Sequence, residues 1–449
     1  MPRYLGVIVI GLCIAAFAGQ VGASVQNALL YKAACRGSTH AWLTLRHRAK
    51  SQRPSAALWY GQYQKTEGHF TRAFVWFHKA AEGRNALAAL EVARAYEAGR
   101  GVSLNKVRGN EWLRRAARGG DVYAEMLCAD QDYEGTDGSQ NISRAAFWYR
   151  KAAHQGNAAA QYQWGRMEQM VFGGAANRRR GIVWWRRAAR QGDTAAQWAL
   201  AEAYAHGMGV LRNTKKSVHW DRLAAHAGVA LAETRLGLAY AFGRGARQRL
   251  RRAVFWYRHA AWLGSAEAMY YLGRAYATGR GVTRNRELSR YWYQRAARRH
   301  LARAQYALGR VYAAGKGVGQ NLKAADRWYR RAARHGYVPA QLRLARAYEE
   351  GSGVTQNDPR AVSWYRRAAY ERSARGALKL ASAYWRGRGI PLDRVEAYRW
   401  YLIARLNARP HSASAGEAAN RMAFARLMLP ASKIARAQHV AWVAERKWQ

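Results

Sequence analysis

The stretch Ala268–Ala297, AMYYLGRAYATGRGVTRNRELSRYWYQRAA, decides the fold because its pattern returns along most of the chain. Two alanines follow a tryptophan at four and five residues in nine of ten copies. Self-similarity at a fixed period predicts a repeat architecture in which each unit buries its apolar face against its neighbours. The tryptophans recur every 36 residues without a slip, at Trp76, Trp112, Trp148, Trp184, Trp220, Trp256, Trp292, Trp328, Trp364 and Trp400.

One repeat unit predicts two helices joined by a tight turn. Ala304, Leu308 and Tyr312 recur at the spacing of an amphipathic helix with one buried face. Gly315 is placed to end that helix, because glycine adopts the left-handed cap conformation at low cost. Asn321 is placed to cap the second helix by accepting a hydrogen bond from a free N–H of its first turn. The unit is therefore expected to be a helical hairpin.

The second helix carries the tryptophan. In the eighth copy Trp328 and the pair Ala332 and Ala333 fall on one side of this helix. The small alanines would let the neighbouring hairpin approach closely, while the indole would fill the space between hairpins. Arg331 and Arg334 fall on the opposite side of the helical wheel. The tryptophan row is therefore expected to be architectural, and the second helices are expected to be basic.

These residues resemble the Sel1-like repeat, a relative of the tetratricopeptide repeat. The resemblance covers about residues 52–406. It implies an all-α fold, an α/α superhelical solenoid of ten helical hairpins with terminal capping helices. It says less about function, because solenoids host unrelated ligands; family members mostly act as adaptors outside the cytoplasm, in envelope regulation, exopolysaccharide assembly or host contact. The pattern is carried in the seventh copy by Ala268, Leu272-Gly273, Tyr276, Gly279, Gly281-Val282, Asn285, Trp292-Tyr293 and Ala296-Ala297.

The chain carries an extreme positive charge. Of 449 residues, 75 are Lys or Arg and 27 are Asp or Glu, which gives a formal net charge of +48. Such a balance attracts polyanions with an affinity that falls as salt rises. Charge alone admits nucleic acid, anionic polysaccharide, lipopolysaccharide and acidic proteins as partners. The alternative is that much of the arginine forms a solvated face that reflects codon usage or an acidic habitat.

Residues 1–23 have the layout of a secretory signal peptide. A short basic start at Arg3 precedes the apolar run Leu5–Phe17, and Val21-Gly22-Ala23 offers a cleavage site before Ser24. The run is short for a membrane span. The segment therefore predicts a periplasmic or secreted protein, with an uncleaved N-terminal anchor as the alternative and as the only expected contact with a membrane.

The remaining segments divide at the ends of the repeats. Residues 24–51 lack the full pattern and are expected to form an N-terminal cap, residues 52–406 the ten repeats, and residues 407–449 C-terminal capping helices. In the last copy Leu402 and Ile403 make the outer face of the helix apolar. Two amphipathic helices, at about 413–428 and 431–447, are placed to cover that face.

Cys128 stands at the leucine position of the first helix in the third repeat. A free cysteine packs as a small hydrophobic residue, so we expect a buried thiol. A disulfide with Cys35 is the alternative, and it would require that position to face outward.

No catalytic or metal-binding motif emerges. The run from Asp130 to Asn141 superficially resembles a calcium loop, but its fifth and twelfth places hold Glu134 and Asn141 where Asp, Asn or Ser and then Glu are needed. The sequence contains no Gly-rich phosphate loop, no Gly-x-Ser-x-Gly elbow and no His-Glu-x-x-His. We expect a protein that is not an enzyme and that holds neither a metal nor a cofactor.

The first helices offer the candidate binding surface. Opposite their core face, arginine recurs six residues after the leading alanine, and a tyrosine, tryptophan or leucine often stands one turn earlier. The resemblance to tetratricopeptide-like solenoids places these helices along a concave groove, where arginine could fork to carboxylate or phosphate while aromatic rings stack on the ligand. In the alternative, the tyrosines pack between first helices and the arginines are merely solvated. The candidate ligand-binding residues are Arg94, Tyr162, Arg166, Trp198, Tyr270, Arg274, Tyr306, Arg310 and Arg346.

Together these features predict a non-enzymatic, exported scaffold or adaptor of the bacterial cell envelope that binds a protein or peptide through its concave face. The alternative is a binder of anionic polymers (exopolysaccharide, lipopolysaccharide or peptidoglycan) or of host proteins. Nucleic acid is not expected as a partner, because it would require the export prediction to be wrong.

Overall fold

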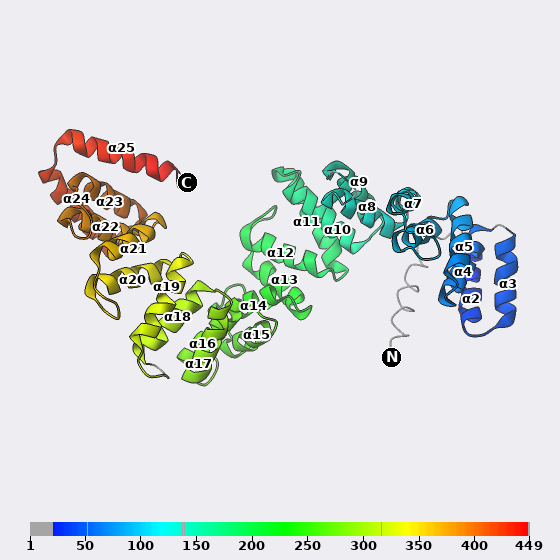
Figure 1. Ribbon diagram of the computed structural model, residues 1–449, viewed down its shortest axis with the longest axis horizontal. Helices are drawn as coiled ribbons and strands as arrows, with labels where there is room; N and C mark the ends of the chain where they lie inside the picture. Colours follow the sequence, from blue (N-terminus) through cyan, green and yellow to red (C-terminus); the bar gives the residue numbers. More distant parts are fainter. Residues whose placement is uncertain (1–20, 52, 137, 139, 316, 448–449) are drawn as a thin grey trace. The chain divides into compact units, whose positions relative to one another are not determined.

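The computed structural model describes residues 21–51, 53–136, 138, 140–315 and 317–447. Within these residues all regular structure is helical, in 24 helices (Figure 1). The helices fall into two compact units. Unit 1 extends to Arg212 and unit 2 begins at Asn213.

Ten helical hairpins make up the repeats, so the predicted fold class is confirmed. The first helices are α4 (Pro54–Thr66), α6 (Ala86–Ala98), α8 (Val122–Glu134), α10 (Ala158–Met170), α12 (Thr194–His206), α14 (Ala230–Phe242), α16 (Ala266–Thr278), α18 (Ala302–Ala314), α20 (Val338–Glu350) and α22 (Ala374–Arg386). The second helices are α5 (Phe70–Glu82), α7 (Lys106–Arg118), α9 (Ile142–His154), α11 (Gly174–Arg190), α13 (Thr214–His226), α15 (Leu250–Trp262), α17 (Arg286–Arg298), α19 (Leu322–Arg334), α21 (Asp358–Tyr370) and α23 (Arg394–Asn407).

The hairpin of α18 and α19 shows how the repeat sequence dictates its turn. Gly315 ends α18 in the left-handed conformation, with φ of 63°. The side chain of Asn321 then accepts a hydrogen bond of 2.8 Å from the backbone N–H of Ala324 and starts α19. Gly309 lies against the ring of Tyr329, where a Cβ atom would stand 2.6 Å from the ring. Both helix ends therefore form as the sequence predicts.

The second glycine of each turn has a role between repeats. Gly281 has φ of 78°, and a Cβ atom there would lie 2.4 Å from the carbonyl oxygen of Leu250 in the preceding repeat. Gly245 and Gly389 approach Thr214 and Asp358 in the same way. In these turns the second glycine therefore lies directly against the start of the preceding second helix. It makes a contact between repeats in addition to shaping the turn.

A buried glutamine ties neighbouring repeats together. Its Nε2 donates to the backbone carbonyl of the second alanine after the preceding tryptophan, at 3.2–3.3 Å. Because both groups are buried, this bond satisfies polar atoms that would otherwise lack partners. The pairs are Gln161 with Ala153, Gln197 with Ala189, Gln305 with Ala297 and Gln341 with Ala333.

The tryptophans lie between successive second helices, as expected. In unit 2 the ring centroid of Trp256 is 5.3 Å from that of His226 on the preceding second helix, in an edge-to-face contact. Trp400 meets Tyr370 in the same geometry at 5.6 Å. One expectation was wrong: Arg331 lies over the ring of Trp328, at 4.7 Å, and not on the opposite side of the helix. Residues three positions apart are neighbours on a helix surface, which explains the contact.

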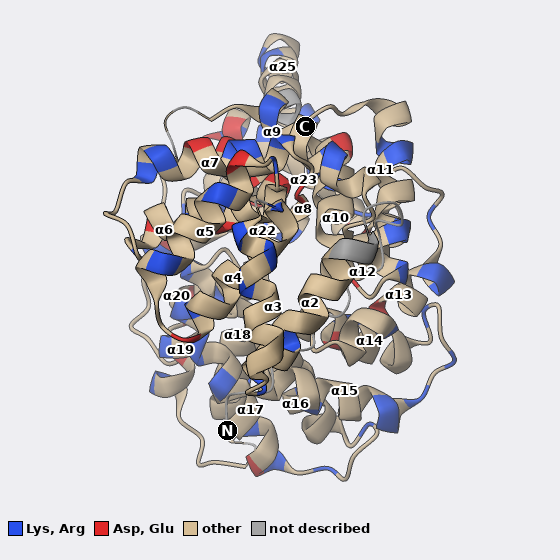
Figure 2. Ribbon diagram, turned by 90° about the vertical axis from the view of Figure 1, so that its right-hand side faces the viewer, with Lys and Arg blue, Asp and Glu red and all other residues tan. Residues whose placement is uncertain are grey.

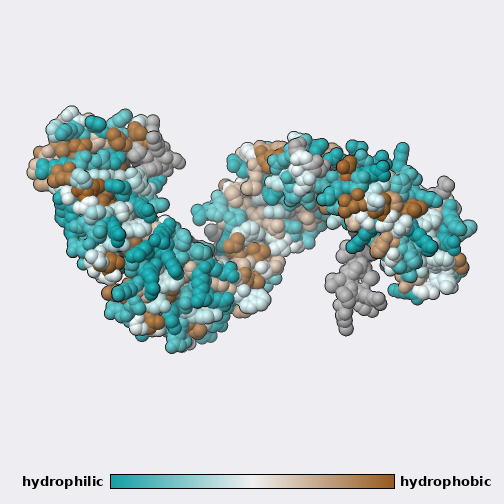
Figure 3. Space-filling model, in the orientation of Figure 1, coloured by the Kyte–Doolittle hydropathy of each residue, from teal (hydrophilic) through white to brown (hydrophobic). Residues whose placement is uncertain are grey.

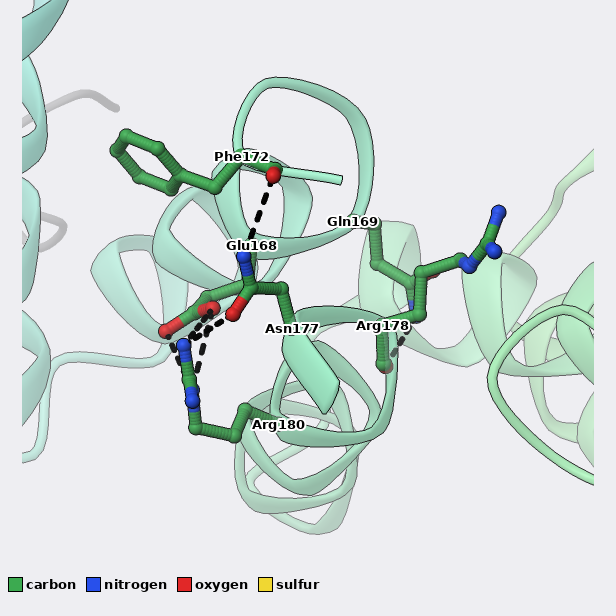
Figure 4. Close-up of polar contacts among 6 residues, drawn as sticks. All are labelled: Glu168, Gln169, Phe172, Asn177, Arg178 and Arg180. Carbon is green, nitrogen blue, oxygen red and sulfur yellow. Dashed lines mark hydrogen bonds and ion pairs between the residues drawn. The ribbon is translucent and has the colours of Figure 1, made fainter. Parts of the chain in front are cut away.

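The fourth repeat departs from the pattern because Val171 replaces the turn glycine. Val171 keeps a right-handed conformation, with φ of −91°, and α11 begins early, at Gly174. Asn177 occupies the position of the capping asparagine, yet it lies inside α11, where its Nδ2 donates to the carbonyl of Phe172 at 3.2 Å (Figure 4). The capping role that its position predicts is therefore wrong for this copy.

Two ion pairs replace the tyrosine of the first helix in the third and fourth repeats. Asp132 lies 2.7 Å from Arg144. Glu168 lies 3.2 Å from Arg180, which approaches both carboxylate oxygens (Figure 4). Both carboxylates are buried, and each is held by an arginine of the second helix. The calcium interpretation of this region has no support, because Asp132 is paired with Arg144 and Asn141 caps α9.

Helices α2 (Val21–Cys35) and α3 (Thr39–Lys50) pack against α4 at the N-terminal end of the repeats. The predicted signal peptide lies mostly outside the described residues. No helix among the described residues is both long and apolar enough to cross a lipid bilayer. Cys35 is exposed and Cys128 is buried, and no disulfide joins them, so that alternative is wrong.

Helices α24 (Ala413–Met428) and α25 (Ala431–Lys447) follow the last repeat with the expected bounds. Both pack against α23. Ile403 and Met422 are buried in the shared core, which the apolar outer face of α23 requires.

Candidate functional site

The sequence-predicted arginines of unit 1 contact aromatic rings of neighbouring first helices. Arg94 on α6 pairs with Glu91 at 3.1 Å and lies 4.8 Å over the ring of Tyr123 on α8. Arg166 on α10 lies 4.9 Å over Tyr133 on α8. The rings that these arginines cover therefore belong to an adjacent repeat, and not to the residue one turn earlier on their own helix.

The aromatic members in unit 1 are partly used by the fold. Tyr162 stacks on Trp185 of α11, with ring centroids 6.4 Å apart, and its carbonyl accepts a hydrogen bond from the indole N–H at 3.1 Å. Trp198 on α12 is half-buried. In this unit the predicted residues form a series of separate contacts along α6, α8, α10 and α12.

Unit 2 brings four predicted residues into one pocket. Tyr270 and Arg274 of α16, and Tyr306 and Arg310 of α18, line a pocket of about 420 Å³. Arg346 on α20 does not line it and pairs instead with Glu350 at 2.6 Å. Adjacent first helices carry the same pair of residues at the same height, which explains why the pocket forms at this junction.

Five further arginines and tyrosines line the pocket, and sequence reasoning missed them. Arg284 and Arg286 come from the turn before α17 and from its first residue, and Arg303 from the start of α18. Tyr293 of α17 and Tyr337, the residue before α20, supply two more rings. The repeat pattern could have identified Tyr293, because it directly follows Trp292. The tryptophans that recur every 36 residues are called the ladder tryptophans below.

The four tyrosine rings of the pocket lie in two contacting pairs. The centroid of Tyr270 is 5.7 Å from that of Tyr293, and Tyr306 lies 5.3 Å from Tyr337. Tyr306 also contacts Tyr329, at 5.5 Å. These tyrosines are half-buried or buried, so part of each ring stabilises the packing of the repeats. The ring partners of Tyr270 and Tyr306 lie on the second helices α17 and α19 and directly before α20, so these tyrosines both pack within the repeats and line the pocket.

The pocket, here named the arginine–tyrosine pocket, is strongly cationic. It has five arginines and four tyrosines in its lining and no carboxylate among the described residues. Arg303 contacts the hydroxyl of Tyr271 at 3.2 Å and lies 4.0 Å from Glu267. In the part of the chain that is described, the other four arginines have no carboxylate within ion-pairing distance. An anion entering this pocket would meet uncompensated charge.

Two of the tyrosines, Tyr293 and Tyr337, have raised pKa values and stay neutral over the physiological range. Burial raises the pKa of Tyr293 to about 12, and Arg274 and Arg310 oppose that rise. Burial also raises the pKa of Tyr337. The hydroxyls therefore remain available as hydrogen-bond donors beside the arginines. Arginine N–H groups and tyrosine hydroxyls together give the lining a set of hydrogen-bond donors suited to binding an anion.

A second pocket of unit 2 shows the contrast. It has a volume of about 540 Å³ and is lined by residues of α20, α21, α22 and α24. Two of its basic residues are paired within the chain: Arg388 lies 3.0 Å from Asp358, and Lys379 lies 3.7 Å from Glu349. Tyr365 donates to Glu349 at 2.6 Å. Carboxylates in the lining thus partly compensate the positive charge of this pocket, whereas the lining of the arginine–tyrosine pocket has none.

Comparison with known proteins agrees with the repeat geometry. Over 94% of each chain, the protein is similar in structure to c5321, a protective antigen of uropathogenic Escherichia coli strains with an SLR fold, at 27% identity and a TM-score of 0.74. A Sel1 repeat protein from Oxalobacter formigenes is 26% identical, over 88% of this chain and 94% of the other, at a TM-score of 0.47. No curated protein sequence matches.

The family comparison covers the whole repeat region. Proteins built from such repeats are non-catalytic scaffolds that typically mediate protein–protein interactions. The Sel1 repeat matches at residues 56–85, 86–121, 122–157, 158–193, 194–229, 230–265, 266–300, 302–337, 338–372 and 374–407. The chain belongs to the Sel1 repeat family.

Proposed function

We propose that this protein is a non-enzymatic scaffold, exported to the periplasm or the cell exterior, that binds a protein partner by seating an acidic segment in the arginine–tyrosine pocket. The observation that carries the proposal is the lining of that pocket, five arginines and four tyrosines without a carboxylate. Arginine binds a carboxylate through two parallel N–H···O hydrogen bonds, and tyrosine rings add apolar contact area at a low cost in conformational entropy.

Export is supported by the N-terminal segment and by one comparison. Residues 1–23 have the layout of a signal peptide. The structurally similar protein c5321 is described as a protective antigen, and an adaptor role in the cell envelope would suit an exported solenoid. Intact-mass measurement on protein from a periplasmic fraction tests this, with a mature chain beginning at Ser24 as the expected result. A full-length chain retained in the cytoplasm would contradict export.

The pocket is tested with a labelled glutamate-rich peptide, and with the same peptide carrying glutamines as the control ligand. Arg274→Ser together with Arg310→Ser should weaken binding of the acidic peptide by about tenfold or more, since charge-assisted hydrogen bonds are each worth roughly 1.5–3 kcal/mol. Arg346→Ser is the matched control, because Arg346 stands at the same repeat position outside the pocket and pairs with Glu350. Equal binding of both peptides, or equal loss in both variants, would rule out the pocket as the site.

A further inference from the structure

Seven of the ten ladder tryptophans carry a stacked cation from the same helix position. The residue three positions after the tryptophan is Arg or Lys, and its charged group lies over the indole at 4.5–5.7 Å. We call these residues the tryptophan-backed cations. They are Lys79, Arg115, Lys151 and Arg187 in unit 1, and Arg295, Arg331 and Arg367 in unit 2.

The indole orients each cation without neutralising it. A guanidinium over a ring face is attracted by the ring and keeps its edge N–H donors directed away from it. All five arginines of the set are exposed. Among the described residues none of these arginines is ion-paired with a carboxylate, whereas Lys151 pairs with Glu125 at 2.9 Å. The arginines are therefore held ready for an external anion.

In unit 2 the three arginines come from consecutive repeats, on α17, α19 and α21. From the tryptophan to the helix end these helices contain no Asp or Glu. Arg298 and Arg334 add exposed charge in the last turns of α17 and α19. Lys and Arg outnumber Asp and Glu in the chain as a whole (Figure 2), and the visible surface over α18 and α19 is mainly hydrophilic (Figure 3). The surface offers positive charge that recurs once per repeat.

This row is separate from the arginine–tyrosine pocket. Tyr293 lines the pocket, and Arg295 lies over Trp292. Two residues of an α-helix are about 200° apart around its axis, so the two side chains leave α17 in nearly opposite directions. A ligand on one surface therefore does not occupy the other.

We infer that the tryptophan-backed arginines of unit 2 form a second interaction surface, for a linear anionic polysaccharide with carboxylates along its chain. Weak, equally spaced sites on one rigid support gain affinity together when a single polymer engages them. Nucleic acid fits the row less well, because single strands bind by stacking bases on aromatic faces, and here the indole faces are covered by arginine. The assignment of a polysaccharide rests on the proposed export, whereas the surface itself rests on the stacking geometry.

Cations in the last turns of helices also offset the helix dipole, so stability must be measured beside binding. The full chain is titrated with polygalacturonate, a linear polymer with one carboxylate per sugar, and with neutral dextran of matched length. The row variant is Arg295→Gln with Arg331→Gln and Arg367→Gln. The control variant removes the same charge from exposed positions outside the row, by Arg251→Gln, Arg409→Gln and Arg436→Gln.

We expect binding to polygalacturonate and not to dextran. The row variant should bind at least tenfold more weakly, and the slope of log K against log salt should fall by about two to three, since each contact releases counterions. The control variant should lose less than about threefold. The row variant should keep the melting temperature within a few degrees and keep its affinity for the acidic peptide, which separates this inference from the proposed pocket.

Three results would overturn the inference. One is an equal loss in both variants, which would indicate diffuse attraction by net charge. Another is binding to dextran as tight as to polygalacturonate. The third is tighter binding to a DNA duplex, lost in the row variant alone, which would assign the row to nucleic acid.

Discussion

The carboxylate Oε1 of Glu233 lies 2.6 Å from Nδ1 of His259, and Glu233 is completely buried between repeats. Glu233 occupies the position at which four other repeats place the glutamine that donates to the preceding repeat. A carboxylate has no N–H to donate, and burial raises the pKa of Glu233 because its charged form is desolvated. The sixth repeat therefore carries a costly charge in a joint where those four repeats use a neutral amide. The third repeat also has a buried carboxylate at this position, Glu125, which pairs with Lys151.

Replacing Glu233 by Gln should stabilise the protein. The new amide can donate to the carbonyl of Ala225, as its counterparts do in other repeats, and the desolvated charge is removed. We expect a gain of about 1 kcal/mol in the free energy of unfolding, seen as a higher melting temperature by circular dichroism. The reverse change, Gln305→Glu, is the matched control, because Gln305 also has a histidine partner, His335, at 3.0 Å. A stabilising Gln305→Glu would contradict this account of the joint.

Asp221 should make stability depend on pH. It takes the place of the aromatic residue that follows the tryptophan in most repeats, it is buried, and burial raises its pKa to about 7. Arg235 lies 3.4 Å away, which is long for a charge-assisted hydrogen bond, so burial outweighs its attraction. The folded chain therefore binds more protons than the unfolded chain between pH of about 4 and about 7, and stability falls as pH rises through that window.

Asp221→Asn removes that titration. The melting temperature of the variant relative to the wild type should rise steadily from pH 4.5 to pH 7.5, because each unit of pKa shift corresponds to about 1.4 kcal/mol. The slope with pH is diagnostic, since the variant also removes the neighbour of Arg235. A difference that stays constant across the window would show that Asp221 ionises normally.

The regular part of the fold could be predicted because each signal is local. Gly315 ends one helix and Asn321 starts the next through contacts with residues close in the sequence. The regular spacing of the tryptophans then determines how the hairpins stack on one another. The fourth repeat escaped prediction because a single residue, Val171, removes the left-handed turn and moves the start of α11. Asn177 carries the right residue type at the right spacing, and only the altered backbone denies it the capping role.

About half of the candidate site followed from periodicity. Four of the pocket residues lie at the same two positions of adjacent first helices, so a helical wheel places them on one face. They are Tyr270, Arg274, Tyr306 and Arg310. Arg284 and Arg303 leave from a turn and from the start of a helix, where the direction of a side chain depends on how closely the repeats approach. Arg346 has the right position but a neighbour, Glu350, that neutralises it. Such pairing depends on rotamers and is not visible in the repeat pattern.

The two cysteines should differ sharply in reactivity. Cys35 is exposed at the end of α2, while Cys128 is 3% exposed in the core of the third repeat. A thiol reagent such as Ellman's should therefore label one cysteine in the native mature chain and a second only after denaturation. Cys35→Ser should abolish the native signal. Rapid labelling of Cys128 in the native Cys35→Ser variant would mean that the first helix of that repeat is not packed as described.

The paired turn glycines allow a test of contact between repeats that separates it from backbone strain. Gly279 and Gly281 both have positive φ, of 73° and 78°, so alanine at either position costs about 1–2 kcal/mol through the left-handed conformation. A Cβ atom at Gly279 would meet only Cβ of Arg284, at 3.4 Å, whereas at Gly281 it would stand 2.4 Å from the backbone carbonyl oxygen of Leu250. Backbone of the preceding repeat can move away only if the two repeats separate.

Gly281→Ala should therefore lower the free energy of unfolding by about 1–3 kcal/mol more than Gly279→Ala does, measured by urea denaturation of the full chain. Equal losses would show that the turn does not rest on the preceding helix and that the second glycine serves the turn alone.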